Sequence, residues 1–397
     1  LLSLKEQLLT IPGLYSQNAY NYAQDLRISI PGFGSRSSFG INGIKILVDG
    51  VPETTPDGQG QLDNLNLWQI AQIEVIKSTS SAIYGNASGG VIHISSQKEF
   101  ASDYLEMNST FGSYGFGAYS LTGGLAKEKT NIIGLAKYLH FSGYRQHSAL
   151  RQFNATLKLH HNFTEKASIS LFAELMDSPL AEDPGGLTLT EAEADFRAAR
   201  QANLDYNAGE AVRQLKAGTR FSYKITPGGS FNSYFFYNRR EFNGRLPFEF
   251  GGIIDLKRNY FGHGADYELK KDANSLKIGY DALFQNDDRQ RFANLNGEIG
   301  QRSFYQEEVF NNFGLYLLDH LKLGRFRFNF GGRYDFNLIK AIDLNVAGGD
   351  NSSTIRLNNF SPSAGLGYLL ANQLLVYTNY SYGFKTPTLN QLSNRPD

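Results

Sequence analysis

Cysteine is absent from this sequence, and tryptophan, methionine and proline are scarce. The chain has 397 residues with Cys 0, Trp 1, Met 2 and Pro 11. Without cysteine there is no disulfide framework, no thiolate metal site and no thiol nucleophile. No run approaches the roughly 18 consecutive apolar residues that a membrane-spanning helix needs. If this chain crosses a membrane, it must therefore do so with strands.

The sequence also has no excess of either positive or negative charge. Lys+Arg 38 balance Asp+Glu 38, and charged residues make up only 19% of the chain. The balance argues against a basic nucleic-acid-binding protein and against an acidic disordered tail. Gly 41, Phe 29 and Tyr 23 are abundant, and this composition favours strands and turns over helices.

From residue 103 onward, apolar and polar side chains alternate with a period of two. The alternation is almost unbroken over 152–160, 167–175 and 325–336. In the last of these segments one face is aromatic, with Phe326, Phe328, Phe330, Tyr334 and Phe336, and the other is polar, with Arg325, Arg327, Asn329, Arg333 and Asp335. This pattern predicts strands with one apolar and one polar face.

The links between these strands are sorted by length. We count about thirteen strands, and short links alternate with long ones, as in a transmembrane barrel. The short links are 126–130, 163–166, 226–229, 270–274, 323–324 and 371–373, and the long ones are 142–150, 177–210, 243–254, 287–302 and 341–358. A soluble antiparallel sandwich has no reason to sort its loops this way. Because bacterial barrels have an even number of strands, an odd count predicts a fragment that lacks its C-terminal strands.

Residues 1–97 have a different, mixed character. Leu1, Leu4 and Leu8 have helical spacing, the apolar runs 44–48 and 73–76 read as strands, and Asp49-Gly50 is a hairpin-turn signal. This segment is predicted to be a small α+β module. A large barrel leaks unless something folded fills its lumen, and the module is the candidate for that role.

Five motifs in the N-terminal module resemble the plug domain of TonB-dependent outer-membrane receptors. They are 36–40 (RSSFG), 47–52 (LVDGVP), 56–61 (PDGQGQ), 73–77 (IEVIK) and 82–92 (AIYGNASGGVI), and the segment 383–387 (GFKTP) resembles a mid-barrel motif of the same family. The resemblance implies a plug domain at 1–97 inside a barrel of about 22 strands, of which 98–397 supply a part.

The resemblance also implies a function. Members of the family are not enzymes, sit in the bacterial outer membrane among lipid and lipopolysaccharide, and import a scarce ligand with energy from the TonB–ExbB–ExbD complex. The expected ligand is a small anion, with a ferric siderophore first. Segments 143–148, 184–188, 251–256 and 386–390 are especially similar to the subgroup that imports pyrroloquinoline quinone, which is the alternative. A passive porin or barrel adhesin is a second alternative, and neither a cofactor, a bound metal nor a nucleic-acid partner is expected.

In this family the ligand rests between the plug apex and the upper barrel wall. The matching apex residues are Arg36, Phe39, Thr55, Asp57, Gln59 and Gln61, and the candidate barrel cations are Arg145, Arg289, Arg291 and Lys385. The plug motifs themselves contribute Asp49, Gly50, Glu74, Tyr84, Gly85, Gly89 and Gly90, and we expect the glycines to form turns or to approach the barrel wall closely.

The sequence departs from the family at two places. Pro31 and Lys77 stand where relatives commonly have arginines that pair with barrel glutamates. Losing the bidentate geometry of arginine predicts a plug that is held more loosely in the barrel.

Overall fold

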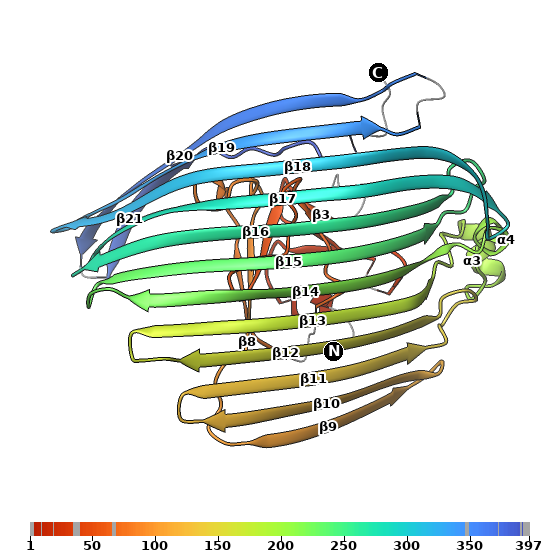
Figure 1. Ribbon diagram of the computed structural model, residues 1–397, viewed down its shortest axis with the longest axis horizontal. Coiled ribbons are helices and arrows are strands. Elements are labelled where there is room, and N and C mark those ends of the chain that lie inside the picture. Colours follow the sequence, from red (N-terminus) through yellow and green to blue (C-terminus); the bar gives the residue numbers. More distant parts are fainter. Residues whose placement is uncertain are drawn as a thin grey trace.

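The barrel part is one antiparallel sheet of thirteen strands, β9 to β21, in which each strand pairs with its neighbours in sequence. The computed structural model describes residues 4–8, 10–18, 20–34, 40–65, 69–345, 349–371, 373–389 and 391. Figure 1 shows the strands side by side in a curved wall. The strands are β9 (Tyr104–Gly112), β10 (Phe116–Lys127), β11 (Thr130–Phe141), β12 (Leu150–Asn162), β13 (Ala167–Glu182), β14 (Gly209–Lys224), β15 (Gly229–Arg245), β16 (Ile253–Lys271), β17 (Asn274–Leu295), β18 (Glu298–Leu323), β19 (Phe326–Asp343), β20 (Ser353–Ala371) and β21 (Leu374–Ser381). The predicted fold class and strand number are confirmed.

The two faces of the sheet differ as the alternation predicts. On β19, Arg333 and Asp335 are buried, whereas Tyr334 and Phe336 are exposed. The polar face therefore points into the lumen and the aromatic face points outward, which is the arrangement of a barrel wall in lipid.

The two ends of the sheet differ in the length of the connections between strands. At one end, which we call the short-turn end, β10 and β11 or β18 and β19 are joined by two residues. At the other, the long-loop end, residues 183–208 carry the helices α3 (Leu189–Ala194) and α4 (Gln201–Asp205) (Figure 1). Among the described residues, no helix is both long and apolar enough to cross a membrane.

One expected loop is wrong. The sequence predicted a long link over 287–302, but β17 and β18 continue through it and meet at a tight turn of Asn296 and Gly297. Both turn residues have positive φ, 53° and 97°, as the favoured two-residue hairpin turns require. Arg289 and Arg291, expected near a strand end, therefore lie inside β17.

The N-terminal module is a plug with its own core, and it lies against the concave face of the wall (Figure 1). A four-stranded sheet of order β5-β4-β8-β7 packs the apolar face of β4 against α1 and β2, with Leu8, Ile28, Ile44 and Ile46 fully buried. The elements are α1 (Leu4–Leu8), β1 (Tyr15–Gln17), β2 (Arg27–Ser29), β3 (Ile41–Asn42), β4 (Ile44–Val48), β5 (Val51–Pro52), β6 (Gln59–Gly60), β7 (Ile70–Ile76), α2 (Ser81–Tyr84) and β8 (Gly90–Ser96). The α+β character predicted for this module is thus observed.

Three ion pairs join the plug to the barrel within the described ranges. They are Asp49–Lys158 at 2.8 Å, Asp63–Arg240 at 2.7 Å and the fully buried pair Glu53–Lys216. In each pair the carboxylate belongs to the plug and the cation to the barrel. Lys77, by contrast, is exposed and donates to the carbonyl of Pro12 within the plug.

Candidate functional site

The apex of the plug is a tight loop after β5 that its own polar side chains stabilise. The Thr55 hydroxyl donates to Asp57 Oδ1 at 2.6 Å, and the amide of Gln59 donates to the same oxygen at 3.4 Å. Gly58 has φ +82°, a conformation that a side chain would strain. The loop then enters β6, which pairs with β3.

Asp57 anchors this loop instead of facing an open cavity. Its side chain is fully buried, and Oδ2 accepts from the amide of Leu389 at 3.3 Å. The same segment after β21 is tied to the plug a second time, because Asn86 donates to the Thr386 hydroxyl at 2.7 Å. Thr55 and Asp57 thus support the apex, and their role as direct ligand contacts stays a prediction.

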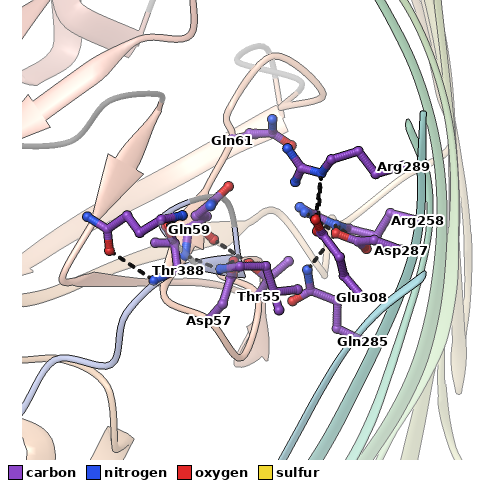
Figure 2. A network of polar contacts seen from close by, with 12 residues as sticks. Thr55, Asp57, Gln59, Gln61, Arg258, Gln285, Asp287, Arg289, Glu308 and Thr388 are labelled. Carbon is purple, nitrogen blue, oxygen red and sulfur yellow. Dashed lines mark hydrogen bonds and ion pairs between the residues drawn. The ribbon is translucent and has the colours of Figure 1, made fainter. Parts of the chain in front are cut away.

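Facing the apex, the barrel wall carries a row of arginines (Figure 2). Arg258 on β16 makes a bidentate pair with Asp287, with Nε–Oδ1 at 2.8 Å and Nη2–Oδ2 at 2.6 Å. Arg289 on β17 pairs with Glu308 on β18 at 3.0 Å. In Figure 2 the side chain of Gln61 points from the plug toward the Arg289 guanidinium.

Between the apex and this wall lies a cavity, which we call the apical cavity. Gln59 and Gln61 line it from the plug, and Arg258, Arg289 and Arg291 line it from β16 and β17. Arg289 and Arg291 are two residues apart on one strand and therefore share a face. Within the described ranges, the Arg291 guanidinium has neither an ion pair nor a hydrogen bond. It is therefore a cation of this cavity that is available to an anion.

The opposite side of the apical cavity is acidic. Asp25 of the plug lines it, together with Asp183 and Glu210 of the barrel. Burial, and then repulsion by Asp63, raises the pKa of Asp25 to about 6. Asp183 accepts from the side-chain amides of Asn21 and Gln24, both at 2.9 Å, so a long loop grips the plug beside the cavity.

The other predicted binding residues lie elsewhere. Arg145 donates to the carbonyls of Gly185 at 2.6 Å and Ala198 at 2.8 Å, so its guanidinium organises the loop 183–208. Lys385 lies beside Gly43 of the plug and not in the apical cavity. Arg36 and Phe39 lie outside the described residues.

Three residues of the plug motifs lie in a turn or contact a neighbouring plug residue. Asp49 and Gly50 form the predicted β4–β5 turn, with φ 51° and 80°. The Tyr84 hydroxyl lies 2.9 Å from His93 Nε2, and burial, followed by the charge of Glu74, raises the pKa of Tyr84 to about 12.

Two of the four glycines in the plug motifs approach the barrel: Gly50, where a side chain would overlap the Arg220 guanidinium, and Gly85. A side chain at Gly85 would stand 3.1 Å from Arg333. Side chains at Gly89 and Gly90 would instead meet other parts of the plug, Phe33 and the carbonyl of Ile76. The expectation of a close approach to the wall is therefore wrong for these two positions.

Several residues of the cavity were not identified from the sequence, among them Arg258 and Asp25. Arg258 follows Ile254 and Leu256 on the inward face of β16, so extending the alternation by one step would have found it. Asp25 carries no such signal, because it lies in an irregular segment before β2 and only the folded plug brings it to Gln61.

Comparison with known families matches both parts of the chain. The TonB-dependent Receptor Plug Domain matches residues 1–91. The family described as TonB dependent receptor-like, beta-barrel matches residues 136–396.

Individual relatives agree with this division. The Ferrioxamine B receptor of Salmonella typhimurium (strain SL1344) is 24% identical over 437 residues, covering 97% of this chain and 59% of that protein. The unliganded ferric citrate transporter FecA superposes with a TM-score of 0.83 at 20% identity, over 98% of this chain and 61% of that one. The copper transporter OprC superposes with a TM-score of 0.73 at 15% identity, over 96% and 60%.

This chain spans about three fifths of the length of the curated relatives it matches. The solved structures establish the fold, and the two family matches together cover most of the sequence. The chain therefore belongs to the TonB-dependent receptors, a family of bacterial outer-membrane β-barrel receptors and transporters that are not enzymes.

Proposed function

We propose that this protein imports a scarce anionic ligand across the outer membrane, with a ferric siderophore as the first candidate. The ligand enters from the long-loop end and binds in the apical cavity. The TonB–ExbB–ExbD complex then supplies the energy that moves the plug and lets the ligand pass. Iron is cargo in this proposal, not a resident cofactor.

The Arg291 guanidinium is the main observation that supports this proposal. It lines the apical cavity next to Arg289, and the plug amides Gln59 and Gln61 face both. Arginines recognise carboxylates and other planar anions in bidentate geometry, and the amides add neutral donors. This donor set suits acidic ferric chelates.

The names of two relatives support the choice of ligand class. One is a receptor for ferrioxamine B and another is a transporter of ferric citrate. Pyrroloquinoline quinone is a tricarboxylate and suits the same arginines, so it belongs in every ligand panel. A passive porin is less consistent with a lumen in which the plug makes three ion pairs to the wall.

Uptake by a receptor-deleted strain that expresses the intact receptor tests the function. We expect accumulation of a labelled ferric siderophore or ferric citrate that stops when the proton-motive force is collapsed. Uptake that continues without the proton-motive force would favour the porin. Uptake of pyrroloquinoline quinone alone would replace the ferric ligand.

Replacing Arg291 tests whether the anion binds in the apical cavity. Arg291→Leu removes a charge-assisted contact worth about 1.5–3 kcal/mol, so the ligand should bind roughly 10- to 150-fold more weakly by calorimetry. Arg213→Leu is the matched control, because Arg213 lies on β14 with its side chain exposed and paired with Asp177. Equal affinity of the two variants would show that the anion binds elsewhere.

A further inference from the structure

A second, larger cavity lies between the plug and the barrel below the apical cavity. This inner cavity has a volume of about 360 Å³. Lys45, Tyr84 and His93 line it from the plug, and Tyr234, Asp281, Tyr316 and Arg333 line it from β15, β17, β18 and β19. These barrel residues lie in the halves of their strands nearer the short-turn end.

An apolar cluster lies between the two cavities along β15, β16 and β17. Val51 of the plug packs against Phe236, Tyr260 and Leu283 of the barrel, and all four are at most 3% exposed. The Tyr260 hydroxyl also donates to the carbonyl of Thr54 at 3.0 Å. We call this cluster the seal, because it closes the contact between plug and barrel at this level of β15, β16 and β17.

Lys45 is the unusual residue of the inner cavity. It lies on β4, on the face opposite the plug core, and is only 5% exposed. Within the described part of the chain its ammonium makes neither a hydrogen bond nor an ion pair. A buried ammonium without a partner is costly, so this group calls for an explanation.

The nearby carboxylates are already engaged with the barrel. Asp281 accepts from the Tyr234 hydroxyl at 2.7 Å and from Arg333 at 2.7 Å. Asp335 accepts from Arg333 at 3.0 Å and from Asn312 at 3.1 Å. Their oxygens point to these partners, and Lys45 keeps its three N–H donors for the cavity.

The electrostatics agree with this geometry. Burial lowers the pKa of Lys45 to about 8, although the charges of Asp281 and Asp335 act in the opposite direction and Arg333 acts with the burial. If Lys45 were merely the counter-ion of these carboxylates, attraction would raise its pKa. Lys45 is thus an under-compensated cation that an anion in the cavity would stabilise.

We infer that the inner cavity is a second binding site for the carboxylate groups of the transported anion, with the Lys45 ammonium as its cation. A ligand that leaves the apical cavity past the seal meets this site before the short-turn end. The step rests on the proposed function, but carboxylate binding at Lys45 can be measured without transport.

Protection of Lys45 from reductive methylation tests the site directly. The probe is citrate, added to the intact receptor in detergent at neutral pH, with modification followed residue by residue by mass spectrometry. We expect Lys45 to react about tenfold more slowly when citrate is at about ten times its dissociation constant. Lys77, an exposed amine of the same plug, should react at an unchanged rate.

Two results would overturn the inner site. One is a Lys45 rate that citrate does not change, and the other is equal protection by sodium chloride at the same ionic strength. Protection without uptake of any ferric ligand would instead refute the transport function and leave the site standing.

A variant separates this role from a structural one. Lys45→Met should slow uptake several-fold while leaving ligand affinity at the apical cavity unchanged, and Lys45→Arg should retain most of the uptake. Equal uptake by Lys45→Met and the parent would contradict the role in transit.

Discussion

Lys216 is a deeply buried barrel cation that pairs with the plug. Its side chain is 2% exposed, pairs with Glu53 and lies 5.8 Å from the ring centres of Phe172 and Phe236. Lys216→Met leaves the Glu53 carboxylate buried without its cation, which costs about 3–5 kcal/mol. We expect this loss in the opening free energy of β4 and β5, measured by hydrogen exchange in the intact receptor.

The matched control restores neutrality. In the double variant Lys216→Met/Glu53→Gln no charge remains, and the glutamine still accepts the bond that Asn64 donates to Glu53 at 2.8 Å. Most of the lost stability should therefore return. A double variant as unstable as the single one would show that the lysine acts through packing and not through charge.

Asp25 gives the plug a dependence on pH. Its pKa is raised from 3.8 to about 6, by burial first and by Asp63 second, while Arg240, Gln61 and Arg258 oppose the shift. A carboxyl whose pKa is higher in the folded state stabilises the fold fully below its unfolded pKa and loses that contribution as the pH rises through its folded pKa. Asp25→Asn should therefore be more stable than the parent above about pH 7, by at most about 3 kcal/mol, and similar below about pH 4.

Urea titrations of plug unfolding at the two pH values check this expectation. Glu193→Gln, an exposed change on α3, is the control and should leave the difference between the two pH values unchanged. An Asp25→Asn plug with the same pH dependence as the parent would assign the effect to another group, such as Glu210.

At the residue scale, the sequence predicted which arginines face the lumen better than it predicted what each arginine binds. Alternation places Arg289 and Arg291 on one inward face, and the structure has them there. Nothing in the sequence distinguishes Arg145, whose guanidinium binds loop carbonyls, from Arg291, whose guanidinium is available, because that difference depends on where residues 183–208 fold back.

At the scale of elements, the β4–β5 turn of the plug contacts the barrel wall. Gly50 has φ +80°, and a side chain there would overlap the Arg220 guanidinium, which donates to the carbonyl of Asp49 at 2.9 Å. Gly50→Ala should therefore cost more than the roughly 1–2 kcal/mol of a left-handed alanine. Gly324→Ala is the control, since Gly324 has φ +59° and nothing within 4 Å.

Thermal unfolding of the intact receptor compares the two alanine variants. We expect the plug of the Gly50→Ala receptor to unfold at a lower temperature than that of the Gly324→Ala receptor. Gly324→Ala should lose only the stability that a left-handed alanine costs. Equal losses would mean that Arg220 moves aside at little cost.

Most strands could be predicted from the period of two, but their lengths could not. The alternation does not say where a strand leaves the membrane, so β17 and β18 were expected to end at a loop that proved to be a continuing hairpin closed by Asn296 and Gly297. The asparagine–glycine pair itself is a strong turn signal and would have shown the hairpin.

For the whole molecule, the charges of the plug–barrel interface change how tightly we expect the plug to be held. The sequence predicted loose attachment because Pro31 and Lys77 replace arginines. The structure provides the pairs Asp49–Lys158, Glu53–Lys216 and Asp63–Arg240 with the opposite polarity. Burial opposes ionisation of Asp49, but the charge of Lys158 and the hydrogen bonds from Lys158 and Ser96 together outweigh it and lower the Asp49 pKa to about 2. The Asp49–Lys158 pair therefore survives mild acid. Attachment does not depend on the family's arginines alone.

At the scale of the whole molecule, we expect the seal to block flow between the apical and inner cavities. Phe236 is fully buried at its centre, and Phe235, the next residue on β15, faces outward with 47% of its surface exposed. Phe236→Ala removes a core ring, at a cost of about 3–5 kcal/mol, and leaves a hole between the apical and inner cavities. We expect the intact receptor with Phe236→Ala to show ion conductance in planar lipid bilayers, whereas Phe235→Ala, which changes only the lipid-facing surface, should remain as tight as the parent. A Phe236→Ala receptor that does not conduct would mean that neighbouring side chains collapse into the hole, or that the barrier to flow lies at another level of the plug.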